Sequence, residues 1–85
     1  MARVTIYSTA TCPICVKAKN LLSRLNIAYD EVRVDQDRAG LRAMLAVSRH
    51  ARTVPQIVVD GRWIGGFSEL TELDMDGGLD ALKPG

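Results

Sequence analysis

The chain contains two cysteines, Cys12 and Cys15, which stand three residues apart in the stretch TCPIC. Cysteines at this spacing can hold a metal, form a permanent cross-link or exchange disulfides. A zinc site needs four ligands, and His50 is the only histidine, so carboxylates or a second chain would have to complete it. A permanent disulfide across so short a loop removes little chain entropy. Reversible thiol–disulfide exchange is therefore the favoured interpretation, and no resident metal is expected.

The segments on either side of the pair predict a strand that leads into a helix. Residues Arg3 to Tyr7 are largely β-branched or aromatic, which is typical of a strand. From Pro13 onward, apolar residues recur at helical spacings of three and four, and proline suits the first helical turn. Cys12 is therefore expected at the start of a helix.

This placement gives the two cysteines different chemistry. Unpaired N–H groups and the positive end of the helix dipole stabilise an anion at a helix start, so the pKa of Cys12 is expected to fall into the range of about 3.5 to 7.5. Cys15 would lie one turn further along the same face, too deep to be the first nucleophile. We expect Cys12 to attack first and Cys15 to attack a sulfur already bonded to Cys12.

The middle of the chain predicts a second strand and a second helix. Apolar and polar residues alternate over Ala28 to Asp35, which has the period of a half-buried strand. Asp37 can cap the helix that follows, and this helix is expected to end in a basic run that starts at Arg49. The first strand, its helix and the second strand form one right-handed βαβ unit with parallel strands.

The last third predicts a hairpin followed by a helix. Two short runs, Ile57 to Val59 and Arg62 to Ile64, flank the turn Asp60-Gly61, so their strands are expected to be antiparallel. Ser68 is expected to cap the closing helix. The element order is βαβαββα, which indicates an α/β fold.

Composition limits the remaining function classes. The 85 residues, 47% of them hydrophobic, suffice for one small domain over residues 1–85. The formal net charge is +1 without a basic stripe, so nucleic-acid binding is not expected. No apolar run approaches the roughly 18 residues of a membrane span, so a cytoplasmic protein without a membrane partner is expected. A close cysteine pair in that reducing compartment is more often catalytic or metal-binding than a permanent cross-link.

Three stretches of the sequence, VTIYSTATCPIC, RTVPQIVVDGRWIGGFSEL and GGLDAL, together resemble the glutaredoxins. The resemblance is to the dithiol CPxC class, with the bacterial glutaredoxin 3 type as the nearest. It implies the thioredoxin fold with a four-stranded mixed sheet. It also implies that the Cys12/Cys15 pair reduces glutathione mixed disulfides and protein disulfides, with glutathione as co-substrate.

The resemblance also implies roles for individual residues. Pro55 would be a cis-proline facing the cysteine motif, and Val54 would offer its backbone N–H and C=O to a bound peptide. The start of the last helix would hold the γ-glutamyl carboxylate of glutathione. The full set expected to contact glutathione is Thr9, Ile14, Arg52, Thr53, Val54, Pro55, Gly66, Phe67, Ser68 and Glu69.

Three positions depart from the family pattern. Thr9 stands where the family commonly has a lysine that attracts the glycine carboxylate of glutathione, so Arg49 or Arg52 would have to substitute for it. Ile14 replaces the usual tyrosine, and Glu69 replaces the usual aspartate. These changes keep the thiol chemistry and affect the affinity for glutathione.

Two other functions remain open at this stage. One is a carrier in which two protomers and two glutathiones hold an iron–sulfur cluster through Cys12, although Pro13 stands where cluster-binding members more often have glycine or serine. The other is a redoxin recharged by thioredoxin reductase. The expected partners are glutathione and disulfide-bonded or glutathionylated proteins, and the expected state is a monomer. Trp63 is expected to pack rather than to bind a ligand.

Overall fold

The computed structural model describes residues 2–84 and contains one mixed sheet of four strands. The strands lie in the order β2-β1-β3-β4, with β1 parallel to β2 and antiparallel to β3, and with β3 antiparallel to β4. Their bounds are β1 Val4–Ser8, β2 Tyr29–Arg33, β3 Gln56–Val59 and β4 Arg62–Gly65. The four-stranded mixed sheet and its parallel βαβ unit are confirmed.

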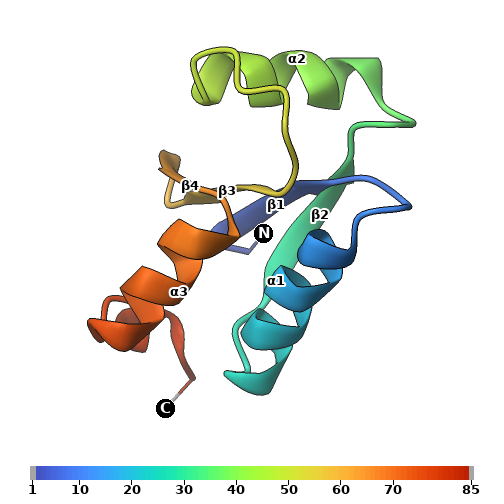
Figure 1. Cartoon of the computed structure of the whole chain (residues 1–85). Coiled ribbons are helices and arrows are strands. Elements are labelled where there is room, and N and C mark those ends of the chain that lie inside the picture. The colour runs from blue at the N-terminus through green and yellow to red at the C-terminus, as the bar shows by residue number, and fades with distance from the viewer. Residues whose placement is uncertain (1, 85) are drawn as a thin grey trace.

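Helices cover both faces of the sheet. The helices are α1 Pro13–Arg24, α2 Arg38–Val47, α3 Phe67–Met75 and the short 3₁₀ helix η1 Asp80–Leu82. Helices α1 and α3 lie on one face and α2 lies on the other (Figure 1). Helix α1 follows β1 and α3 follows β4, and these two strands run in the same direction. The N-termini of the two helices therefore lie at the same end of the sheet, near each other (Figure 1). This arrangement brings the CxxC segment close to residues more than fifty positions later in the chain.

The main core fills the space between the sheet and the α1/α3 layer. Side chains of β1 alternate, so that Val4, Ile6 and Ser8 are buried while Thr5 and Tyr7 are partly exposed. The buried apolar residues packed in this layer are Val4, Ile6, Ala18, Leu21, Leu22, Ile27, Ile57, Leu70 and Leu79. Burial of this face fixes the position of α1, and with it the position of the two cysteines.

The hairpin has the turn that its sequence predicts. Asp60 and Gly61 both have positive φ, 52° and 80°, as the two central residues of a tight hairpin turn require. The turn directs Trp63 back alongside β3, where its partner in the ladder is Val58.

Several element boundaries differ from those expected. Strand β1 is Val4–Ser8 rather than Arg3 to Tyr7, and α2 ends at Val47, before the basic run that starts at Arg49. Two further differences follow from side-chain contacts. Strand β2 ends at Arg33 rather than Asp35, because Asp35 lies in a turn and directs its carboxylate to Arg33 and to the loop before α1. Helix α3 begins at Phe67, so Gly66 and not Ser68 is the N-cap. Glu69 explains the difference, since its carboxylate accepts a hydrogen bond from Gly66 N–H at 2.7 Å. The helix therefore begins two residues before the start that a Ser68 cap would give.

None of the helices within residues 2–84 is both long and apolar enough to cross a membrane.

Candidate active site

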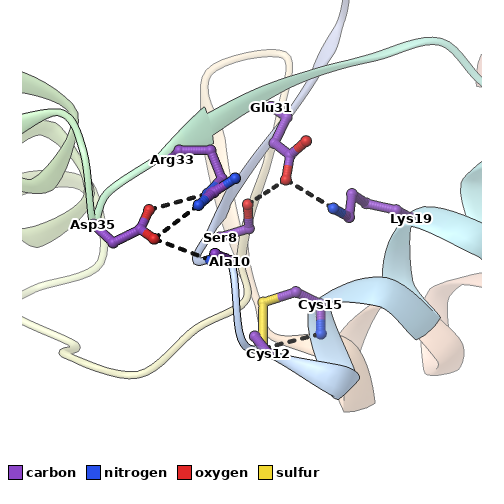
Figure 2. A network of polar contacts seen from close by, with 8 residues as sticks. All are labelled: Ser8, Ala10, Cys12, Cys15, Lys19, Glu31, Arg33 and Asp35. Carbon is purple, nitrogen blue, oxygen red and sulfur yellow. Dashed lines mark hydrogen bonds and ion pairs between the residues drawn. A yellow bond between two sulfur atoms is a disulfide. The ribbon is translucent and has the colours of Figure 1, made fainter.

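The cysteine pair lies at the N-terminus of α1, as predicted. Cys12 is the N-cap residue, and its Sγ accepts a hydrogen bond from Cys15 N–H at 3.1 Å (Figure 2). Cys15 is completely buried, whereas Cys12 is partly exposed. The two sulfurs are bonded to each other, so the structure represents the oxidised form of the pair. The N–H that reaches the sulfur in this state also points at the place where a Cys12 thiolate would carry its charge.

The loop before β3 lies against the cysteine pair. The peptide bond between Val54 and Pro55 is cis, as the resemblance implied. The carbonyl oxygen of Val54 is 3.7 Å from the Sγ of Cys12. Backbone from this loop therefore borders the more exposed of the two sulfurs.

A hollow of about 390 Å³ opens beside Val54, between the start of α1, the loop before β3 and the start of α3. Its lining combines apolar side chains with backbone and hydroxyl groups, the mixture typical of a small-molecule site. The lining residues are Ile14, Lys17, Thr53, Val54, Pro55, Gln56, Gly66, Phe67, Ser68 and Glu69. The structure thus brings together most residues of the expected glutathione set.

Two members of the expected set do not line the hollow. Thr9 and Arg52 are both absent from its walls, as is Arg49. Arg49 instead has a positive φ of 55° in the turn after α2. The cation at the hollow is Lys17, which is exposed and lies one helical turn after Ile14 on α1.

Lys17 and Gln56 are the lining residues that sequence reasoning missed. Helical spacing carries a signal for Lys17, because a residue three positions after Ile14 shares its face of the helix. No comparable signal exists for Gln56, because its place at the hollow depends on where the loop before β3 meets the starts of α1 and α3.

The start of α3 brings both the Glu69 carboxylate and the N–H groups of the first helical turn to the hollow. The Glu69 carboxylate satisfies Gly66 N–H, while the helix dipole leaves a positive end in the first turn. A ligand carboxylate at this point would therefore meet both helix N–H groups and the charge of Glu69.

Behind the cysteines, a buried hydroxyl joins β1 to an ion pair. Ser8 is completely buried and donates to the carboxylate of Glu31, which also pairs with Lys19 at 2.8 Å (Figure 2). The ammonium of Lys19, and then the Ser8 hydroxyl, lower the pKa of Glu31 below its ordinary value. This cluster links strand β2 to α1 on the face that carries Cys15 (Figure 2).

A second carboxylate holds the loop that precedes Cys12. Asp35 accepts two hydrogen bonds from Arg33, at 3.0 and 2.8 Å, and one from Ala10 N–H at 3.1 Å (Figure 2). These contacts, with Arg33 the larger cause, lower the pKa of Asp35 to about 2. The carboxylate is charged at neutral pH and ties the turn after β2 to the loop before α1.

The site combines a partly exposed cysteine at a helix start, a buried cysteine one turn later and a facing cis-proline. A known family matches this chain. The model of the glutaredoxin family matches residues 4–64 of the chain. The chain belongs to the glutaredoxin family. Glutaredoxin 3 of Escherichia coli strain K12 is 44% identical to it over 82 residues, which cover 96% of this chain and 98% of that protein.

Solved structures confirm the thioredoxin fold of this glutaredoxin. The buckwheat glutaredoxin–glutathione complex matches it with a TM-score of 0.83 and 28% identity, covering 96% of this chain and 76% of that one. The dithiolic glutaredoxin 2-C-Grx1 of Trypanosoma brucei brucei matches with a TM-score of 0.80 and 35% identity, covering 95% and 86%. This glutaredoxin is accordingly a thiol–disulfide oxidoreductase with a redox-active cysteine pair.

Proposed function

We propose that this glutaredoxin reduces mixed disulfides between glutathione and proteins, and also protein disulfides, with glutathione as the electron donor. The observation that carries the proposal is the position of the Cys12 sulfur, which accepts the Cys15 N–H and lies 3.7 Å from the Val54 carbonyl at the wall of the hollow. A ligand sulfur in this hollow would be within reach of the sulfur that the helix start prepares for attack.

In the proposed reaction the Cys12 thiolate attacks the glutathione sulfur of a protein–glutathione disulfide. A new disulfide forms between Cys12 and glutathione, the old one breaks, and the protein leaves as a thiolate that takes up a proton. A second glutathione thiolate then attacks the Cys12-bound glutathione. This step releases oxidised glutathione and restores the Cys12 thiolate.

Cys15 provides the second route. Its thiolate attacks the Cys12 sulfur, expels the bound thiol and leaves the Cys12–Cys15 disulfide, the state that the structure represents. Two glutathiones then reduce this disulfide in succession. Complete burial of Cys15 supports its role as the resolving residue, because an external disulfide reaches Cys12 first.

The hollow supports an assignment of the glutathione subsites. The cysteinyl part of glutathione would pair with the backbone of Thr53 and Val54, beside Pro55. The γ-glutamyl carboxylate would lie at Gly66 to Glu69, where the start of α3 offers N–H groups and the Ser68 hydroxyl.

The glycine carboxylate of glutathione would be bound by Lys17, the one cation among residues 2–84 that lines the hollow. Lys17 takes the role that the sequence suggested for Arg49 or Arg52, with Ile14 and Phe67 as the apolar parts of the rim. We further propose that the protein acts as a cytoplasmic monomer whose partners are glutathione and glutathionylated or disulfide-bonded proteins.

The test is the reduction of a glutathionylated peptide by glutathione, coupled to glutathione reductase and NADPH. Wild type and Cys15→Ser are expected to release the peptide thiol, whereas Cys12→Ser is expected to be inactive. A Cys15→Ser protein without activity would contradict the assigned roles. Turnover with thioredoxin reductase alone, and none with glutathione, would overturn glutathione as the electron donor.

A further inference from the structure

We propose that Gln56 is a positioning residue that fixes the Thr53–Val54 peptide, so that Val54 N–H faces the ligand hollow, and that Trp63 sets the orientation of Gln56. The inference deepens the proposed function, because Val54 is the residue proposed to pair with the cysteinyl part of the substrate. It assigns a role to a side chain that lies immediately after the cis-proline and has no part in thiol chemistry.

A chain of hydrogen bonds connects the outer strand of the sheet to the loop of the active site. The indole Nε1–H of Trp63 donates to the Gln56 Oε1 at 2.8 Å. The Gln56 Nε2 donates to the Thr53 carbonyl at 3.0 Å and lies 3.2 Å from the Thr53 hydroxyl oxygen. Gln56 is only 5% exposed, so both ends of its amide are used inside the protein rather than in water.

Trp63 removes the ambiguity in the orientation of the Gln56 amide. An indole N–H can only donate, so the oxygen of the amide must face it and the NH₂ must face Thr53. The reversed amide would place donor against donor at Trp63 and acceptor against acceptor at the Thr53 carbonyl. A buried amide with both contacts reversed would be costly, so one orientation is fixed.

The orientation of the Thr53 carbonyl determines where Val54 N–H points. The two groups belong to one planar trans peptide, in which the C=O and N–H bonds point in opposite directions. Since the Thr53 carbonyl points at the Gln56 amide, the N–H of the same peptide points away from that amide. Among residues 2–84, Val54 N–H has no hydrogen-bond acceptor, while Val54 itself lines the hollow.

A backbone donor held in this way is prepared to pair with a ligand carbonyl. An extended ligand accepts such a bond as a neighbouring strand would, and pre-alignment reduces the ordering cost on binding. Without the Gln56 bond the Thr53–Val54 peptide can rotate, and the ligand must then align it. The effect falls on binding rather than on sulfur transfer, because Gln56 contacts neither cysteine.

The substitution that tests the role is Gln56→Met, which keeps an unbranched side chain of similar length and removes the donor and the acceptor. We expect the KM for a glutathionylated peptide to rise about fivefold with kcat nearly unchanged, the signature of lost uniform binding. Gln36→Met is the matched control, since Gln36 is the other glutamine and lies exposed in the turn before α2. Gln56→Met with the KM of wild type would overturn the proposal.

A second readout measures the position of Val54 N–H directly. In a Cys15→Ser protein that carries glutathione on Cys12, we expect the Val54 amide to be protected from hydrogen exchange, and we expect the protection to fall about fivefold when Gln56→Met is added. Equal protection in both proteins would overturn the positioning role. Failure of glutathione to load onto Cys12 would instead contradict the proposed function, so the two failures are distinguishable.

Trp63→Phe keeps the test decisive if Gln56→Met does not fold. It removes the indole donor from a side chain that is 39% exposed, so the core is little disturbed. The expected result is a rise in KM of about twofold with reduced protection of Val54, because the Gln56 amide loses the contact that orients it. Unchanged KM and unchanged protection in Trp63→Phe would overturn the proposal.

Discussion

Two helix N-termini border the active site, and they are capped in different ways. At α1 the acceptor for a first-turn N–H is the Cys12 sulfur, at 3.1 Å from Cys15 N. At α3 the acceptor is the Glu69 carboxylate, which lies inside the helix and reaches back to Gly66 N–H. The cap of α1 is therefore the reacting atom itself, whereas the cap of α3 is a fixed charge that a ligand anion must share.

The loops that lead into these helices also differ in how they are held. Asp35, which comes from the turn after β2, accepts from Ala10 N–H and holds the loop before α1 through a contact across 25 residues. The turn before α3 is held by Glu69 through a contact across three residues. The nucleophile is thus positioned by tertiary structure and the proposed anion site by local structure, so changes at the two sites should have different consequences.

The largest effect is expected at the cap of α1. Cys12→Ser should abolish reduction of a glutathionylated peptide, because serine cannot form the mixed disulfide. The helix should remain, since serine is a good N-cap and its Oγ can accept the Cys15 N–H as the sulfur does. We expect thermal melting of Cys12→Ser to match that of reduced wild type within a few degrees, and a collapse of the fold would contradict capping by Cys12.

At α3, the corresponding test is Gly65→Ala. Gly65 has φ of 115°, and a Cβ built on it would lie 2.6 Å from the Glu69 Oε1 and 2.7 Å from its Cγ. We expect the free energy of unfolding to fall by about 2 kcal/mol, because backbone strain and displacement of the Glu69 cap add together. Denaturant unfolding measures the loss.

Gly61→Ala is the matched control for this substitution. Gly61 also has positive φ, 80°, but a Cβ there would meet nothing within 4 Å. Its cost should be about 1 kcal/mol, that of the backbone conformation alone. Equal losses at the two glycines would show that the Glu69 cap contributes nothing to the start of α3.

Predictability from the sequence does not follow this contrast, because it depends on whether the local signals are unambiguous. The start of α1 follows from local signals, since Pro13 and the apolar spacing define both the helix and the place of Cys12 in it. The hairpin likewise follows from Asp60-Gly61 alone. These features can be predicted without knowing the structure of the rest of the chain.

The errors and omissions arose where local signals compete or where contacts are long-range. Ser68 has a high N-cap propensity, but Glu69 caps Gly66 instead, and the sequence alone gives both residues a good local position. Lys17 and Gln56 line the hollow because helices and strands distant in sequence meet there. Arg52 does not line the hollow, so its expected contact with glutathione stays a prediction.

A smaller effect is expected from the charge of Glu69. Glu69→Gln keeps an acceptor for Gly66 N–H and removes the negative charge from the proposed carboxylate subsite. The KM for glutathione should fall about threefold, as expected for one surface charge, and the gain should shrink at high salt. The free energy of unfolding should fall by about 0.5 kcal/mol, because the helix dipole loses a favourable anion.

Glu72→Gln controls for the change in net charge. Glu72 lies one turn further along α3, is exposed and has no side-chain hydrogen bond within residues 2–84. Its substitution should leave the KM for glutathione nearly unchanged. If Glu69→Gln and Glu72→Gln lowered KM equally, relief of long-range repulsion between α3 and the ligand anion, rather than the capped α3 start, would account for the effect.

The smallest effect concerns the carboxylate that holds the loop before α1. The pKa of Asp35 is about 2 in the folded protein, below its ordinary value of 3.8, chiefly because Arg33 donates to it. A depressed carboxyl pKa contributes stability that is complete above the ordinary value and is lost as the pH falls through the folded value.

Asp35→Asn keeps an acceptor for Ala10 N–H, so it removes only the charged part of the contact. We expect Asp35→Asn to be slightly less stable than wild type in denaturant unfolding at neutral pH, and the difference to disappear between about pH 4 and pH 2. A difference that stays constant over this range would show that the charge of Asp35, and with it the ion pair with Arg33, does not contribute to stability.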